Sequence, residues 1–231
     1  MRRNEVGSRA SAAADEGSGA RVAPRDERRP TRYVAVIADP PWRFENRGSR
    51  ASPDYNARAD GARRRSASYS TMTLDDVAGL PVESVAAEDC LLGLWAPAAM
   101  LLGTSGEPSS VSRVLAAWGG FRGVDVVPWV KGRWDGDDLV RPVGLGNYVR
   151  HAAEYLVIAV RGSVRVPTSL RRAGVLLPTA GAKGEAGRDL VGSLVPDGPR
   201  AELFARGSVE GWDVWGDEAV GVPRWLRATL G

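Results

Sequence analysis

A short apolar run that ends in an acid and two prolines most constrains how this chain can fold. Residues Tyr33–Ala38 read Tyr-Val-Ala-Val-Ile-Ala, and a continuous apolar run with β-branched residues is typical of a buried parallel strand. Asp39, Pro40, Pro41 and Trp42 follow, and the prolines stop ladder pairing because neither has a backbone N–H. Asp39 is therefore expected at the carboxyl end of a strand, where open α/β sheets bind their ligands.

These four residues suit a site that holds a planar amine. The lone pair of an exocyclic amine on a base is delocalised into the ring, so the amine is a poor nucleophile. Asp39 and the carbonyl of Pro40 can accept its two hydrogens, and Pro41 restricts Pro40 to the extended region, which holds that carbonyl in place. Trp42 can stack on the base. The simpler alternative is a turn that leaves a strand, with Trp42 merely packed beside it.

The composition is that of a globular protein without disulfides or a metal cluster. The 231 residues, 43% of them hydrophobic, fit one domain with a sizeable core. Cys90 is the single cysteine and His151 the single histidine, so we expect no disulfide framework and no metal site. The longest apolar stretch, 90–103, is too short to span a membrane. The N-terminus lacks the apolar segment of a signal peptide, so a cytoplasmic location is expected.

The positive charge lies in the first 32 residues. They contain eight arginines and five acids, which accounts for the whole net charge of +3. Because the same segment has almost no large apolar side chains, we predict a disordered basic tail over 1–32 and one domain over 33–231. Charge alone is therefore weak support for a polyanionic partner.

A second charged segment, 43–68, directly follows the Asp-Pro-Pro-Trp motif. It has seven arginines, three acids and no apolar periodicity. Long loops without secondary structure are usually functional or disordered. We predict a mobile loop that grips the substrate, with Arg63, Arg64 and Arg65 contacting phosphate groups; a solvated insertion is the alternative.

The remaining chain alternates between strand and helix patterns, which predicts an α/β fold with a mostly parallel sheet. Thr73 is expected to cap a short helix, and a broken helical pattern after Pro97 stops at Gly119-Gly120. Further strands are predicted at 91–95, 124–130, 154–160 and 201–205, a helix at 185–194 and a loop at 134–146. The segment 164–177 is ambiguous between a strand and a turn.

Several blocks together resemble the DPPW adenine methyltransferases, the MT-A70 family, over residues 33–218. The blocks that carry the resemblance are Asp39-Pro40-Pro41-Trp42, Tyr69-Ser70-Thr71-Met72, Leu94-Trp95, Trp129-Val130-Lys131, the segment 146–154 that ends in Glu154, the run 202–206 and the run 211–218. Ordered blocks at this spacing are far more specific than the tetrapeptide alone.

The resemblance implies a Rossmann-like S-adenosylmethionine-dependent methyltransferase sheet with the permuted, β-class order of motifs. It also implies roles for individual residues, each with a plainer alternative in packing, capping or a solvated charge. Lys183 is expected to pair with the methionine carboxylate of the cofactor, beside Asp39. The other expected cofactor contacts are Phe204, Arg206, Asp217 and Glu218, and the expected substrate contacts are Tyr69, Lys131 and Glu154.

The function that the resemblance implies is methylation of N-6 of adenine in nucleic acid, with DNA favoured over RNA because no RNA-binding appendage is recognisable. An RNA adenine methyltransferase and a non-catalytic nucleic-acid-binding or partner subunit are the alternatives, and a homo- or heterodimer is left open. Two departures from the family pattern stand out: Asp217 replaces a frequent Asn, and Gly184 replaces a frequent Pro. The loop over 43–68 is longer than is typical, so substrate preference does not carry over.

Overall fold

The computed structural model describes residues 32–43, 71–103, 105–140, 149, 151–178 and 182–216. The tail predicted over 1–32 and the loop predicted over 43–68 lie almost wholly outside these residues. The described elements, in chain order, are β1 (Tyr33–Ala38), α2 (Leu74–Ala78), α3 (Val82–Val85), β2 (Ala86–Ala96), α4 (Ala98–Leu101), α5 (Ser110–Ala117), β3 (Arg122–Val130), β4 (Arg133–Asp135), β5 (Asp138–Val140), β6 (Ala153–Arg161), the 3-10 turn η1 (Thr168–Leu170), α6 (Lys183–Leu194), β7 (Arg200–Leu203) and β8 (Asp213–Trp215).

The main sheet has six described strands in the order β3-β6-β2-β1-β7-β8. The pairs β1–β2, β1–β7 and β7–β8 are parallel, whereas β6 runs antiparallel to both β2 and β3. Within the described residues β6 is thus the one reversed strand of this sheet, and the prediction of a mostly parallel α/β sheet is confirmed.

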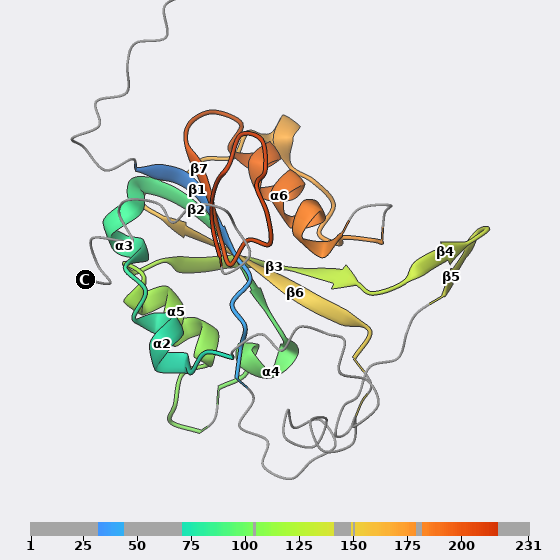
Figure 1. The fold of residues 1–231 in the computed structure, drawn as a ribbon, viewed down its shortest axis with the longest axis horizontal. Coiled ribbons are helices and arrows are strands. Elements are labelled where there is room, and N and C mark those ends of the chain that lie inside the picture. Colours follow the sequence, from blue (N-terminus) through green and yellow to red (C-terminus); the bar gives the residue numbers. More distant parts are fainter. Residues whose placement is uncertain are drawn as a thin grey trace, which may run out of the picture.

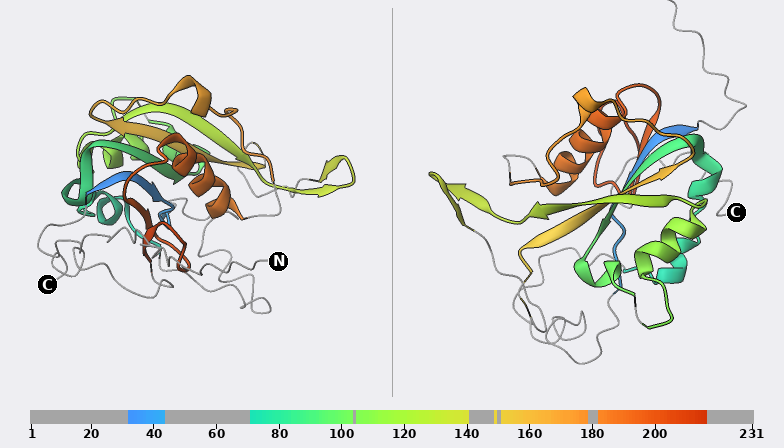
Figure 2. Two further views of the ribbon diagram at one scale, coloured as in Figure 1. Left: turned by 90° about the horizontal axis from the view of Figure 1, so that it is seen from above. Right: turned by 180° about the vertical axis from the view of Figure 1, so that it is seen from behind.

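Helices cover both faces of the sheet (Figure 1). On one face α2 and α5 pack over a core that includes Val77, Val114 and Trp118, while on the other face α6 contributes Leu190 and Val191 to a second core. The two layers are also visible from above and from behind (Figure 2). Among the described residues no helix is long and apolar enough to cross a membrane.

The strands β1 and β7 lie side by side at the point where the strand order reverses. From β1 the chain crosses to β2 on one side, and from β7 it continues to β8 on the other side. Their ends are in register, since Ala38 pairs with Leu203, and the N–H of Asp39 donates to the carbonyl of Leu203 at 3.4 Å. Ligands of open α/β sheets bind at such a switch point, at the carboxyl ends of the strands.

Local signals in the sequence correctly predict the start of α2 and the end of α5. Thr73 caps α2 in a capping box, in which its hydroxyl accepts from the N–H of Asp76 and its own N–H donates to the Asp76 carboxylate. After α5, Gly119 and Gly120 take φ values of 110° and 73°, a conformation that ends a helix and that glycine adopts without a steric penalty.

The loop predicted over 134–146 is partly wrong. Arg133–Asp135 and Asp138–Val140 form a two-stranded hairpin that projects from the body of the molecule (Figure 1). Gly136, with φ of 60°, begins the two-residue turn of this hairpin, and such a turn favours strand pairing. The prediction of a loop rested on the charge and glycine content of the segment. In the ambiguous segment, η1 and a single bridge between Leu176 and Trp129 are the regular features.

Helix α6 packs tightly onto the sheet because it has a glycine at the contact. A Cβ atom added at Gly187 would lie 2.8 Å from the ring of Trp95 and 2.9 Å from the end of Ile37. Both neighbours are in the core, 1% and 2% exposed, so neither can move aside easily. The missing side chain at Gly187 therefore sets how close the first turn of α6, which begins at Lys183, comes to the end of β1.

Replacing Gly187 by Ala is expected to destabilise the protein by about 1–3 kcal/mol, because overpacking the contact forces Trp95 or α6 to shift. Thermal or urea unfolding measures the change. Gly192→Ala in the same helix is the matched control. Its Cβ would meet the guanidinium group at the far end of the Arg200 side chain at 3.3 Å, and alanine favours the helix by roughly 1 kcal/mol over glycine. Equal losses in both variants would contradict the close-packing argument.

Candidate active site

The Asp-Pro-Pro-Trp segment leaves β1 as a turn held by backbone hydrogen bonds. The N–H of Trp42 donates to the carbonyl of Pro40 at 2.8 Å, and the N–H of Met72 donates to the carbonyl of Pro41 at 3.0 Å. Trp42 and Met72 also form an isolated parallel bridge just before α2. The Pro40 carbonyl thus already accepts one hydrogen bond, and one of its two lone pairs remains for a ligand.

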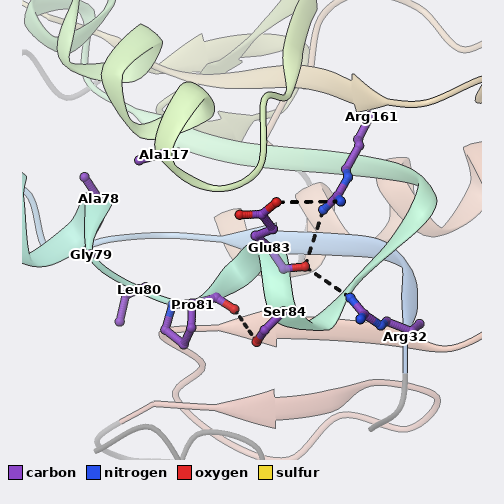
Figure 3. A pocket seen from close by; sticks show the side chains of 9 residues that line it. All are labelled: Arg32, Ala78, Gly79, Leu80, Pro81, Glu83, Ser84, Ala117 and Arg161. Carbon is purple, nitrogen blue, oxygen red and sulfur yellow. Dashed lines mark hydrogen bonds and ion pairs between the residues drawn. The ribbon is translucent and has the colours of Figure 1, made fainter. Parts of the chain in front are cut away.

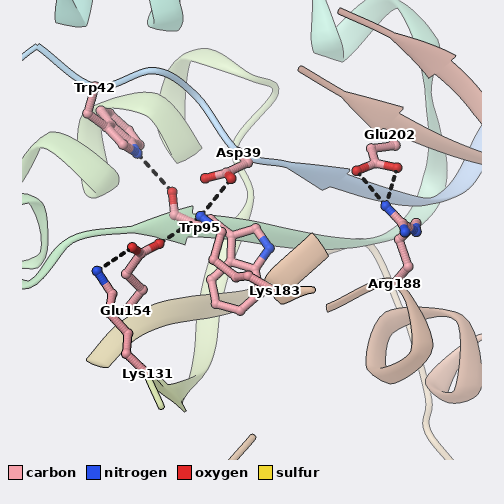
Figure 4. A network of polar contacts seen from close by, with 8 residues as sticks. All are labelled: Asp39, Trp42, Trp95, Lys131, Glu154, Lys183, Arg188 and Glu202. Atoms are coloured by element: carbon pink, nitrogen blue, oxygen red, sulfur yellow. Dashed lines mark hydrogen bonds and ion pairs between the residues drawn. The ribbon is translucent and has the colours of Figure 1, made fainter. Parts of the chain in front are cut away.

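Trp42 is part of the core. Its side chain is 8% exposed, and its indole N–H donates to the carbonyl of Trp95 at 2.8 Å, at the end of β2 (Figure 4). This burial satisfies both the apolar ring and its one donor. The side chain therefore anchors the turn in this structure. Stacking of Trp42 on a base stays a prediction, and it requires the ring to move out of the core.

Asp39 belongs to a network of four charged side chains from four elements (Figure 4). Lys183 Nζ lies 2.6 Å from Asp39 Oδ2 and 2.7 Å from Glu154 Oε2, and Lys131 Nζ lies 2.7 Å from Glu154 Oε1. The contributing positions are the end of β1, the first residue of α6, the start of β6 and the residue after β3. All four residues were expected to contact ligands, and the structure joins them to one another through Lys183 and Glu154.

The network is balanced in charge and only partly open to solvent. Its side chains are between 21% and 34% exposed, so the ion pairs are less screened than surface pairs. Burial alone raises the pKa of Glu154, but the charges and hydrogen bonds of Lys183 and Lys131 outweigh burial and hold the pKa below its usual value. Glu154 is therefore ionised at neutral pH.

Trp95 is a core residue whose ring also contacts the ammonium group of Lys183. The ammonium lies 5.1 Å from the centroid of its ring, within the range of a cation–π contact. The indole Nε1 is buried and has no hydrogen-bond partner among the described residues. A buried donor without a partner is uncommon in proteins, and here it lies beside the charged network.

A second buried ion pair, which the sequence analysis did not identify, lies next to the network. Arg188 Nη1 is 3.0 and 2.9 Å from the two carboxylate oxygens of Glu202, and Glu202 is 9% exposed. Burial raises the pKa of Glu202, the Arg188 guanidinium opposes this, and the negative charge of Asp39 adds to the increase. The sequence does contain one signal for this pair, because Glu202 is an acid inside the apolar run 201–205 and a buried acid needs a partner.

The end of β7 is strained and aromatic. Phe204 has a φ of 64°, which side chains other than glycine rarely adopt and which occurs preferentially at functional sites. Its ring meets that of Trp215 edge to face, with 5.1 Å between centroids, and is only partly buried. Arg206 is exposed two residues later. Phe204 thus lies directly after the strand that neighbours β1, and its role as a pocket residue stays a prediction.

Several predicted site residues lie outside the described residues: Tyr69, Arg63, Arg64, Arg65, Asp217 and Glu218. Their assigned roles remain predictions. Among the described residues no group of three His, Cys, Asp or Glu side chains has an arrangement that could hold a metal ion. Burial raises the pKa of the Cys90 thiol to about 12, so this cysteine is not a nucleophile at neutral pH.

A cavity of about 520 Å³, lined in part by Arg32 just before β1, lies at the other end of that strand from Asp39 and is not part of this site (Figure 3). Arg32, just before β1, and Arg161, at the end of the reversed strand β6, both donate to the carbonyl of Glu83. Arg32 also donates to the carbonyl of Ala86. The two guanidinium groups therefore satisfy carbonyls at the end of α3, where an intrahelical partner is missing.

The sequence is similar to those of known methyltransferases. The chain is similar to the type II methyltransferase M.MunI of a Mycoplasma species, with 28% identity over 197 residues, 81% of this chain and 78% of that protein. It is also similar to two fungal proteins named N6-methyladenosine RNA methyltransferase MTA1, with 30% identity to that of Pyricularia oryzae and 29% to that of Cryphonectria parasitica. It spans about half the length of these fungal relatives, 47% and 52%.

A sequence model of the MT-A70 family matches residues 33–218, the same range over which the motif blocks resemble that family. This range includes every described strand and helix from β1 to β8, and it contains all four members of the charged network. The chain therefore belongs to the MT-A70 family of methyltransferases.

Proposed function

We propose that this protein is an S-adenosylmethionine-dependent methyltransferase that methylates N-6 of adenine in nucleic acid, with DNA as the preferred substrate. The observation that carries the proposal is the position of Asp39. Its carboxylate lies at the carboxyl end of β1, at the switch point of the sheet, and is paired at 2.6 Å with Lys183 from the start of α6. An acceptor for an amine and a cation for a carboxylate thus lie side by side.

The residues around Asp39 fit the proposed cofactor. Lys183 would hold its methionine carboxylate, because a lysine ammonium is a compact cation with three donors. Phe204 would lie against an apolar part of the cofactor, with Arg206, Asp217 and Glu218 as the further predicted contacts. When bound, S-adenosylmethionine supplies an electrophilic methyl group on a sulfonium sulfur.

The residues of the chain have simple tasks in this reaction. Asp39 and the free lone pair of the Pro40 carbonyl accept hydrogens of the exocyclic amine, which localises its lone pair and orients the nitrogen for attack. The target adenine must leave the base stack to reach them. Because Trp42 is buried here, stacking of the flipped base requires either a movement of its ring or another side chain, such as the predicted substrate residue Tyr69.

Asp39→Ala is expected to lower methylation by about 100-fold or more, since the acceptor that orients the amine is removed. Lys183 keeps Glu154 as a partner, so the fold and part of the affinity for S-adenosylhomocysteine should persist. Mass spectrometry of N-6-methyladenine after nuclease digestion measures the loss, with Asp39→Asn as the isosteric comparison. Normal turnover in the alanine variant would exclude this role for Asp39.

Lys183→Met is expected to weaken binding of S-adenosylhomocysteine about tenfold, as for the loss of one hydrogen bond to a charged group. Isothermal titration calorimetry measures the dissociation constant. 5′-Methylthioadenosine, which lacks the carboxylate, is the matched ligand and should bind wild type and variant alike. If the variant lost affinity for both ligands equally, Lys183 would act through the fold and not through the carboxylate.

The relatives of this chain bear on whether its substrate is DNA or RNA. The similarity to M.MunI, which is named as a type II methyltransferase, covers most of both chains, and this supports DNA. The fungal relatives are named as RNA methyltransferases, which keeps RNA as the second candidate. The cytoplasmic location and a homo- or heterodimeric state stay predictions.

Plasmid DNA and transcribed RNA of the same sequence, incubated with the protein and S-adenosylmethionine, are expected to yield N-6-methyladenine mainly in the DNA. Reaction with single-stranded oligonucleotides of both kinds separates the need for base flipping from the preference for the sugar. Product in RNA alone would assign the protein to the second candidate. If neither nucleic acid were methylated and the protein failed to bind cofactor, a non-catalytic partner subunit would become the better description.

A further inference from the structure

Lys183 is shared between two carboxylates, and the proposed chemistry requires one of them. Its ammonium lies 2.6 Å from Asp39 Oδ2 and 2.7 Å from Glu154 Oε2. The contact with Glu154 is a hydrogen bond that Lys183 donates, and the contact with Asp39 is an ion pair. As long as Lys183 holds Oδ2, this oxygen is not fully available as the acceptor for an incoming amine.

Releasing Asp39 has an electrostatic cost that depends on what else surrounds the ammonium. The Lys183 side chain is 21% exposed. If Asp39 were its only protein anion, moving away from Asp39 would leave the ammonium poorly hydrated and unpaired until a ligand carboxylate arrived. Glu154 removes this difficulty because it is already in contact at 2.7 Å. Lys183 can therefore turn away from Asp39 and keep a carboxylate partner throughout.

We propose that Glu154 is a positioning residue that holds Lys183 away from Asp39 in the loaded site, so that Asp39 is free to accept the amine hydrogens. This inference rests on the proposed methyltransferase function. Glu154 then acts through Lys183, in addition to or in place of the direct substrate contact predicted from the sequence. Lys131, bound to the other oxygen of Glu154 at 2.7 Å, keeps the carboxylate oriented toward Lys183.

The first test is Glu154→Gln, which keeps the shape of the side chain and removes its charge. We expect kcat/KM for the nucleic acid to fall about tenfold, as for a lost charged hydrogen bond, while affinity for S-adenosylhomocysteine stays within about threefold. Glu154→Asp retains the charge and should recover part of the rate. If Glu154 had only a structural role, the melting temperature, the cofactor affinity and the rate would instead fall together in both Glu154→Gln and Glu154→Asp.

Asp75→Asn is the matched control. It also removes one carboxylate from an ion pair, with Arg113 at 3.0 Å, but on α2, away from the network. Its turnover should equal that of the wild type. Unchanged turnover in Glu154→Gln as well would overturn the proposed role of Glu154.

A second measurement does not need turnover. In crystal structures with S-adenosylhomocysteine bound, Lys183 of the wild type should contact Glu154 and be clear of Asp39, whereas in Glu154→Gln it should remain on Asp39. A wild-type complex with Lys183 on Asp39 and away from Glu154 would overturn the inference. A wild-type protein that neither binds S-adenosylhomocysteine nor methylates nucleic acid would exclude the proposed function and with it this inference. An active wild type together with unchanged turnover in Glu154→Gln would exclude only the role of Glu154.

Discussion

The ion pair between Lys183 and Asp39 is the interaction on which the site depends. It joins the end of β1 to the first turn of α6 at 2.6 Å, and the same helix lies close against Trp95 at Gly187. The same approach places the Lys183 ammonium over the Trp95 ring. Packing of an apolar surface thus determines where a charge lies, and that charge lies beside Asp39, the proposed acceptor.

The edge of the sheet at the end of β1 is built rigidly. Two prolines end the strand, backbone hydrogen bonds hold the turn against the segment before α2, and the indole of Trp42 is buried and bonded to the carbonyl of Trp95. In the proposed reaction the amine is a poor nucleophile, so a fixed acceptor helps by holding its nitrogen in the orientation needed for attack. The strained backbone at Phe204, directly after the neighbouring strand β7, supports a ligand site at the same ends of the strands.

The candidate site was predicted unevenly. The position of Asp39 followed from the strand pattern and the prolines, and Lys183 came from the resemblance to the family. The direct contacts among Asp39, Lys183, Glu154 and Lys131 were not predicted, because they join residues that are far apart in the sequence and no local pattern encodes such distances. The burial of Trp42 and the pairing of Arg188 with Glu202 were missed for the same reason: a motif gives the type of a side chain but not the surroundings in which it packs.

The sequence by itself determined the α/β class, the position of β1, the capping of α2 by Thr73 and the end of α5, because each follows from interactions within a few residues. It also determined membership of the family, through several blocks in a fixed order. Only the tertiary structure decided that β6 is reversed, that residues after β3 form a hairpin, and that two lysines and two carboxylates balance one another. Those features depend on contacts between distant segments, where packing and the pairing of partly buried charges outweigh local preference.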